Sequence, residues 1–362
     1  MATFNGQLNT NEIFAALYNM IISQQVFVDN IASTSSELVD MSRVDGSMYG
    51  DTKLYYATDV LESTPWGNDA ESMNLLETHR PKAPECQKIT LDVFRQISLT
   101  VSDYLDKRAW GDEGAFNSFK SVMLGWMGDT KKVYDATTFN AYVGTAKSPK
   151  ETENITIDVT TAVGDTTGEE KARIEAGVIG ENIAKLITNL KDITRDYNDL
   201  GYLRSYNIDD LVFVWNSDAV AKIEKRDLPT IYHKDIIDKM GEYVLPARYF
   251  GTVNTEAKTG DGKTIRSLIE QDVKKAGSPD VHVFAGDLIP TGYSATANTS
   301  YTVDGSILFK VMHRKSVPYM SAFEVGTSFF NAKSLTDNRY LTFGHNTLEY
   351  ITQYPFITVK QI

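Results

Sequence analysis

The residues of this sequence best suited to chemistry are residues 257–264, which read Ala-x4-Gly-Lys-Thr. This is a relaxed form of the phosphate-binding loop, in which backbone amides would surround phosphates and Lys263, beside Thr264, would reach the outer ones. Such a loop leaves a buried strand and opens a helix, yet residues 251–256 make a poor strand and Ala257 replaces the first glycine. We interpret the segment as a solvated turn, with a nucleotide-binding enzyme that uses Lys263 and Thr264 as the alternative.

The other candidate groups lack the spacing of a catalytic or metal site. The five histidines are never close enough in sequence to form a local metal pair, and the Gly-x-Ser-x-Gly nucleophile motif is absent from the sequence. Cys86 is the single cysteine, so it cannot form an internal disulfide, and nothing beside it would activate its thiolate. We therefore predict no catalytic, cofactor-binding or metal-binding residues and no enzymatic activity.

The charge of the chain bears on its partners. The 362 residues include 48 acidic and 36 basic side chains, which gives a formal net charge of -12. Such a chain lacks the cationic surface that drives binding to nucleic-acid phosphates. The first basic residue is Arg43, which argues against a secretory signal or a mitochondrial transit peptide. The early apolar run 13–22 is too short to span a membrane. We expect cytoplasmic synthesis and no membrane contact.

Hydrophobic spacing predicts the elements of the first half. Turn formers flank residues 53–61, which read as one arm of a hairpin that carries two adjacent tyrosines. Apolar residues alternate with other residues through 89–101, which predicts a long strand with one buried face. Helical spacing then extends through 113–143, with a weak joint at Gly128.

The second half mixes helices and strands, so the fold class is α+β. Thr167 and Glu170 form a capping box before a helix over 168–193, whose apolar stripe is expected in the core. Residues 251–300 are predicted to be mainly loops with one helix over 265–275. The other predicted strands are 211–215, 307–312, 340–350 and 356–359.

Tyrosine and phenylalanine are concentrated in extended segments that a two-domain monomer could not readily cover. Aromatic residues make up 11% of the chain. Large exposed apolar surfaces imply partners, so the composition favours an assembly protein.

The local sequence and the order of elements resemble the major capsid proteins of tailed bacteriophages, which have the Hong Kong 97 fold. The resemblance begins at "DVFRQISLTVSDYLDKRAW" and "GAFNSFKSVMLGWMGDTKKVYDATTFNAYVG" and covers roughly residues 43–362. It implies a hairpin arm called the E-loop, a peripheral domain with a long spine helix, and an axial domain. The implied boundaries are an N-terminal arm at 1–42, the E-loop at 43–88, the peripheral domain at 89–150, the axial domain at 151–304 with a loop-rich insertion at 251–300, and the closing peripheral strands at 305–362.

This resemblance implies a protein that self-assembles, through hexamers and pentamers, into an icosahedral shell around a phage genome. The shell would face packaged double-stranded DNA without specific binding, and separate scaffolding, portal and decoration proteins are expected partners. Encapsulin compartment shells share the topology and remain an alternative. The expected assembly interface lies on the hairpin arm, at Leu54, Tyr55, Tyr56 and Trp66, because a two-stranded hairpin alone cannot bury such side chains.

Overall fold

The structure is a computed structural model that describes residues 37–46, 50–63, 80–102, 113–224, 241–322 and 324–362. The side chains of 113–124, 221–224 and 241–242 are outside that description. Trp66, one of the expected interface residues, also lies outside the described residues.

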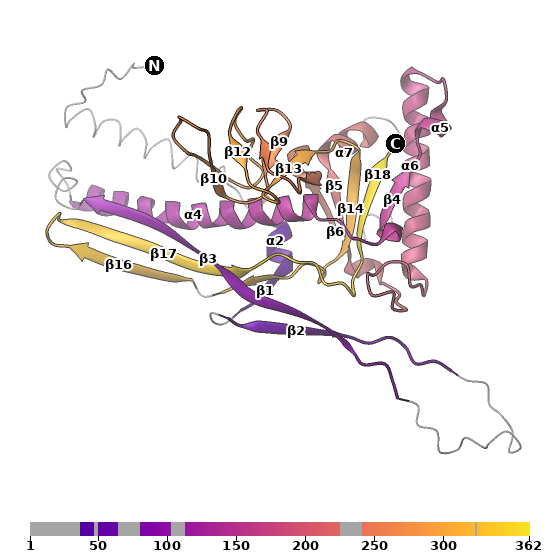
Figure 1. Ribbon diagram of the computed structural model, residues 1–362, viewed down its shortest axis with the longest axis horizontal. Helices are drawn as coiled ribbons and strands as arrows, with labels where there is room; N and C mark the ends of the chain where they lie inside the picture. Colours follow the sequence, from indigo (N-terminus) through magenta and orange to yellow (C-terminus); the bar gives the residue numbers. More distant parts are fainter. Residues whose placement is uncertain (1–36, 47–49, 64–79, 103–112, 225–240, 323) are drawn as a thin grey trace, which may run out of the picture.

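A long helix and a six-stranded sheet form one half of the molecule (Figure 1). Helix α4 (Glu113–Thr145) is continuous through Gly128, so the predicted weak joint does not interrupt it. The sheet has the order β1-β15-β17-β3-β2, with β16 paired to β17. Its strands are β1 (Arg43–Asp45), β15 (Tyr319–Ser321), β17 (Thr336–Asn346), β3 (Glu85–Ser102), β2 (Thr52–Ala57) and β16 (Val325–Asn331).

Strand β3 belongs to two parts of this sheet at once. Its C-terminal part pairs with β17, from Ser102 opposite Thr336 onwards. Its N-terminal part pairs with β2, where Glu85 lies opposite Ala57. The predicted strand over 89–101 is confirmed and is longer than predicted, because the pairing with β2 continues it to Glu85.

A five-stranded sheet forms the second half and is covered on both faces. Its order is β4-β18-β14-β5-β6. Side chains at odd positions of β5, such as Phe213, join the cluster that includes α6 residues, and those at even positions, such as Val214, join the cluster that includes α4 residues. Burial on both sides explains why β5 reads as a continuous apolar run. The strands are β4 (Asn154–Ile157), β18 (Phe356–Gln361), β14 (Ile307–His313), β5 (Leu211–Asn216) and β6 (Gly241–Leu245).

Helices flank this second sheet and the short segments around it. Helix α6 (Gly168–Lys191) begins after Thr167 as predicted, but the Thr167 side chain makes no capping hydrogen bond. Helix α7 (Ser217–Glu224) follows Asn216, whose side-chain oxygen accepts a hydrogen bond from the Asp218 amide at 3.1 Å. The shorter helices are α2 (Glu37–Ser42), α5 (Thr160–Val163), η3 (Glu151–Glu153), η4 (Ile208–Asp210) and η5 (Ala247–Tyr249). Among the described residues, no helix has both the length and the apolar character needed to cross a lipid bilayer.

Residues 251–303 form three small sheets above α4 (Figure 1). The helix predicted over 265–275 is wrong, because Ile265 to Ser267 pair with a strand more than thirty positions later in the chain. The spacing of Ile265, Leu268 and Ile269 suits a helix, but long-range pairing overrides this local preference. The strands are β7 (Gly251–Val253), β8 (Lys258–Thr259), β9 (Ile265–Ser267), β10 (Gln271–Val273), β11 (Val281–Val283), β12 (Ser294–Ala295) and β13 (Ser300–Val303).

Candidate assembly surface

The β2–β3 hairpin lies at the edge of the six-stranded sheet and projects beyond the rest of the molecule (Figure 1), and it exposes apolar side chains along one arm. Leu54 is 50% exposed, Tyr56 is 61% exposed and, beyond the end of β2, Leu61 is 76% exposed. Tyr55 points to the other side, where it is half-buried against the small core cluster that contains Ile89. Burial is also the main reason that the pKa of Tyr55 is raised. The hairpin therefore presents Leu54 and Tyr56 outward, whereas Tyr55 packs on its own subunit.

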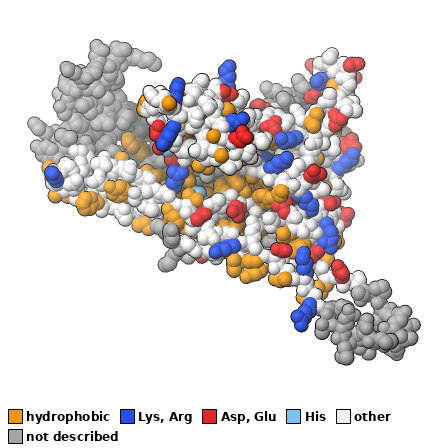
Figure 2. Space-filling model, viewed as in Figure 1, with side chains coloured by type: hydrophobic (Ala, Val, Ile, Leu, Met, Phe, Trp, Pro, Cys, Tyr) orange, Lys and Arg blue, Asp and Glu red, His pale blue; other side chains and the backbone are white. Residues whose placement is uncertain are grey.

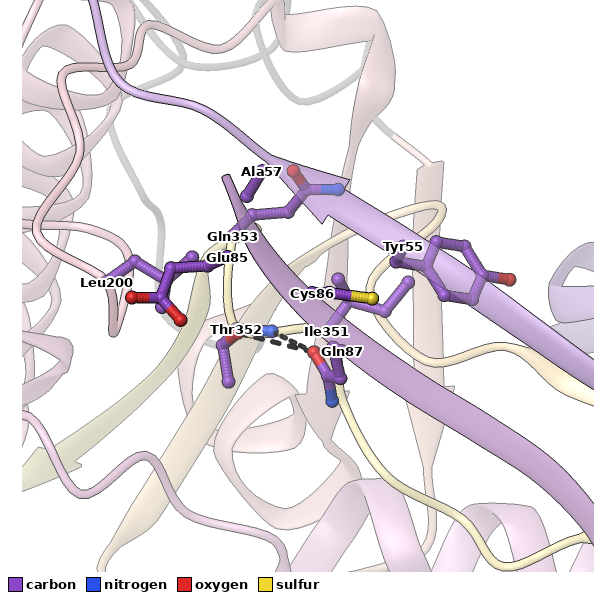
Figure 3. A pocket seen from close by; sticks show the side chains of 9 residues that line it. All are labelled: Tyr55, Ala57, Glu85, Cys86, Gln87, Leu200, Ile351, Thr352 and Gln353. Carbon is purple, nitrogen blue, oxygen red and sulfur yellow. Dashed lines mark hydrogen bonds between the residues drawn. The ribbon is translucent and has the colours of Figure 1, made fainter. Parts of the chain in front are cut away.

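The root of the hairpin is held to the C-terminal segment of the chain (Figure 3). Gln87 on β3 donates to the carbonyl of Tyr350 at 2.9 Å and accepts from the amide of Thr352 at 3.0 Å. The recess beside it, which Tyr55 and the exposed Cys86 line, measures about 60 Å³. A recess of this size is too small for a ligand of ordinary size. Its residues fix the direction of the hairpin.

A second contact holds the outer arm just beyond β2. The Asp59 carboxylate accepts hydrogen bonds from Arg195 Nη1 at 2.6 Å and from the Leu203 amide at 3.0 Å. The hydrogen bond from Arg195, together with the amide hydrogen bond, lowers the pKa of Asp59 to about 2. Arg204 donates to the neighbouring carbonyl of Thr58. The loop that follows α6 thus anchors the arm between the exposed side chains of β2 and the exposed Val60 and Leu61.

The β16–β17 hairpin is a second exposed apolar surface, which the sequence analysis missed. Phe329 and Phe330 are neighbours in β16 and are 64% and 52% exposed. Because successive side chains of a strand point to opposite faces, neither face of β16 is covered there. Figure 2 shows hydrophobic side chains along this edge and near the root of the β2–β3 hairpin. The two adjacent phenylalanines in this strand were the feature of the sequence that could have revealed the surface.

Between this hairpin and the middle of α4 lies a shallow recess of about 380 Å³. Met127 and Gly128 of α4 line one side, and Tyr340 and Leu341 of β17 line the other. Val325 and Leu335, at the two ends of the hairpin, are each 42% exposed. The second surface therefore combines an exposed strand edge with a hollow that a side chain from another molecule can enter.

The segment with the phosphate-loop pattern has a different structure from the one that the pattern requires. It runs from β8 through a turn into β9, so it joins two strands rather than a strand and a helix. The Asp261 carboxylate accepts hydrogen bonds from the amides of Lys263 and Thr264, both at 2.8 Å, and the Thr264 hydroxyl also donates to it. These bonds lower the pKa of Asp261. The amides needed for phosphate are already occupied, and the turn reading is confirmed.

Metal-ligating side chains do not gather in the described part of the structure. Within the part of the chain that the structure describes, no cluster of His, Cys, Asp and Glu side chains could hold a metal ion. His282 lies between two carboxylates, with Nδ1 at 2.7 Å from Asp272 and Nε2 at 3.0 Å from Glu270. The Asp272 hydrogen bond is the largest of the effects that raise the pKa of His282, as expected for an ion-paired imidazolium on an exposed strand.

Comparison with known proteins gives one family and a set of similar folds. The family model described as "Phi29-like phage major capsid protein" matches residues 2–360. No curated protein matches the chain. A chain in the capsid structure of Staphylococcus phage Andhra is 12% identical, with a TM-score of 0.58, and the match covers 89% of this chain and 83% of that one. A chain in a structure of the head fiber and inner core protein gp22 of bacteriophage P68 is 10% identical, with a TM-score of 0.56 and coverage of 87% and 83%.

Proposed function

The chain belongs to the Phi29-like phage major capsid protein family, and from this premise we propose that its β2–β3 hairpin joins neighbouring subunits of the shell. As a member of that family it is a structural protein of the virion, and its copies form an icosahedral capsid. The enzyme and encapsulin alternatives have no support from the comparisons. The proposal concerns how this particular chain makes the contacts between copies.

The elements of this chain can be assigned to the subdomains of the Hong Kong 97 fold. We assign the β2–β3 hairpin, with residues 58–84, to the E-loop and helix α4 to the spine helix. The six-stranded sheet beside α4 is assigned to the peripheral domain, and the five-stranded sheet with α6 and α7 to the axial domain. Residues 251–303 are an insertion in the axial domain. The order of these elements in the chain supports the assignment.

The observation that carries the proposal is the exposed apolar side of the hairpin arm. Leu54, Tyr56, Val60 and Leu61 are all at least half exposed, so the described residues of their own subunit leave these side chains largely uncovered. Full burial of such a side chain contributes about 1.5 to 3 kcal/mol. A neighbouring subunit that covers several of them at every contact stabilises a closed shell over free subunits. Hexamers and pentamers built in this way are the expected units.

The net charge of the chain bears on a partner other than a second copy, the packaged DNA. A formal charge of -12 suits a shell that faces double-stranded DNA without holding it, because phosphates are repelled by an acidic lining. Synthesis in the cytoplasm of the host bacterium and assembly with separate scaffolding, portal and decoration proteins complete the proposal.

The test is a triple variant of the arm, Leu54→Ser, Tyr56→Ser and Leu61→Ser, examined by negative-stain microscopy and circular dichroism melting. We expect a folded subunit that makes no shells. The matched control replaces three exposed apolar residues away from the hairpin, Val244, Ile269 and Leu288, with serine. Normal shells from the arm variant, or equal loss of shells in the control, would refute the proposal.

A further inference from the structure

The C-terminal end of α4 meets the five-stranded sheet (Figure 1), and a recess lined by three lysines lies at this junction. It measures about 280 Å³. Lys147 follows the end of α4, Lys310 lies on β14 and Lys360 lies on β18, and all three line the recess. Its rim is exposed at Lys147, whereas Lys310 and Thr358 in its floor are buried. Three cationic side chains around one hollow are unexpected in a chain that is acidic overall.

The charge of Lys310 is poorly compensated. The side chain is 1% exposed, and its ammonium group donates a hydrogen bond to the carbonyl of Ala146 at the end of α4. An ammonium group can donate three hydrogen bonds, and Ala146 supplies the one acceptor among the described residues. The Phe356 ring, 5.5 Å from Nζ, adds a weaker contact.

The other charges near the recess do not neutralise Lys310. Burial, followed by repulsion from Lys360 and Lys147, lowers the pKa of Lys310 to about 7. The carboxylate of Asp304 is paired with Lys360 at a distance of 2.6 Å. A buried ammonium without a paired anion is strongly disfavoured. The recess therefore has a positive potential that an anion would offset.

Thr358 gives independent support for a binding site here. It lies directly opposite Lys310 in the β14–β18 pair, so the two side chains share a face. Its Oγ1 is buried and has no hydrogen-bond partner among the described residues. A buried hydroxyl without a partner costs about 1 to 3 kcal/mol, and a bound group that accepts its hydrogen removes this cost.

We propose that this recess binds a small oxyanion, of the class of inorganic phosphate, between the ammonium groups of Lys310, Lys147 and Lys360 and the hydroxyl of Thr358. The chemistry is that of charge-assisted hydrogen bonds from cationic donors to anionic oxygens. The bound anion would connect the end of α4 to β14 and β18, so it would stabilise the junction between the two halves of the subunit. Because it binds the folded state, it raises the stability of that state by mass action.

The test titrates inorganic phosphate, and separately sulfate, into the full chain by isothermal titration calorimetry at constant ionic strength. We expect saturable binding of both ions at pH 6.5. Lys310→Met should weaken it about tenfold or more, because the buried donor is lost. The matched control, Lys191→Met, removes an exposed lysine of α6 and should bind like the parent. Absence of saturable binding to the parent, or unchanged binding in Lys310→Met, would overturn the proposal.

Two further readouts do not depend on Lys310→Met folding well. Thr358→Val should weaken anion binding severalfold yet raise the melting temperature of the anion-free chain, because it removes an unpaired hydroxyl. Sulfate keeps its charge between pH 6 and 9, so its affinity should fall as pH rises through the pKa of Lys310 and the ammonium is lost. A destabilised Thr358→Val, or sulfate affinity independent of pH, would contradict the proposed site.

Discussion

Glu153 and Asp199 bring two carboxyl groups into one buried polar site between η3 and the loop after α6. Glu153 is fully buried, and the Asp199 carboxylate accepts hydrogen bonds from Ser148 at 2.7 Å and from Tyr350 at 2.5 Å. Burial first, and then the charge of Asp199, raise the pKa of Glu153. Ionising Glu153 here would bury a second negative charge beside Asp199, so Glu153 keeps its proton to a higher pH than an exposed glutamate does.

The first prediction follows from the retained proton of Glu153. The folded state holds a proton on Glu153 at pH values where the unfolded chain, with a pKa near 4.5, has already released it. Stability should therefore fall as pH rises from about 5 towards the raised pKa. Glu153→Gln keeps the neutral form, and we expect it to be about 1 to 2 kcal/mol more stable than the parent at pH 8 and similar at pH 5. Thermal melts across this pH range measure the difference, and parallel curves for the two proteins would contradict it.

A second prediction concerns the stripe of α6 that packs on the five-stranded sheet. Ile183 is 6% exposed and belongs to that core, so Ile183→Asp should bury an unpaired charge and destabilise the fold by several kcal/mol. Arg173→Asp changes an exposed position of the same helix and should change stability by less than about 0.5 kcal/mol. Denaturant unfolding of both variants separates the two effects. An unchanged midpoint for Ile183→Asp would show that the stripe is not core.

A third prediction separates the adjacent tyrosines of β2. Tyr55→Ser removes a side chain that packs on Ile89 and its neighbours, so it should lower the free energy of unfolding by about 1 to 3 kcal/mol. Tyr56→Ser should leave that free energy nearly unchanged, because the side chain is 61% exposed, and should instead weaken assembly. Melting of unassembled subunits beside light scattering of assembly gives both quantities. The reverse pattern would mean that the roles are exchanged.

A fourth prediction tests the β16–β17 hairpin as a second contact between copies. Replacing Phe329 and Phe330 together with serine should leave the melting temperature of the subunit unchanged and reduce the yield of closed shells. Lys333→Ser, in the turn of the same hairpin, is the control for a polar exposed position. Normal shells from the double variant would remove this hairpin from the assembly surface.

A fifth prediction concerns the contact that anchors the hairpin arm. Asp59→Ala removes the acceptor for Arg195 and for the Leu203 amide, so hydrogen exchange at the Leu203 amide should accelerate. In the parent the same contact should persist above the ordinary aspartate pKa of 3.8 and be lost as pH falls towards 2. Asp165→Ala, at an exposed position elsewhere, should leave the exchange at Leu203 as it is in the parent. Unchanged exchange in Asp59→Ala would show that another group holds the loop.

Elements with a buried face could be predicted from the sequence, and elements without one could not. Strand β3 was predicted because its alternation reports one buried side, and α6 because its apolar stripe packs on a sheet. Strand β16 was missed because its residues are exposed on both faces and leave no pattern of burial. The strand predicted over 340–350 instead spans Thr336–Asn346, since its register is set by pairing with β3.

The polar sites were less predictable than the fold because their residues are far apart in the sequence and meet only in the folded chain. Lys147, Lys310 and Lys360 meet only because β14 and β18 pair beside the end of α4. The same holds for Asp59 and Arg195, which are joined through the loop after α6. Leu54 and Tyr56 were predicted as interface residues because a short hairpin cannot cover its own apolar side chains; both are exposed, and their role in assembly stays a prediction.

Because β3 pairs with β2 at one end and with β17 at the other, it has a mechanical role to play in a shell whose subunits pull on one another. A pull on the projecting hairpin acts along the axis of β3, and the backbone hydrogen bonds between β3 and β17 lie across that axis. Such a load acts as shear on the whole ladder at once, instead of opening one pair after another as in unzipping. Tension between neighbouring subunits would therefore be distributed over the full β3–β17 ladder beside α4, so the strand that reaches out of the subunit would also transmit force into its sheet.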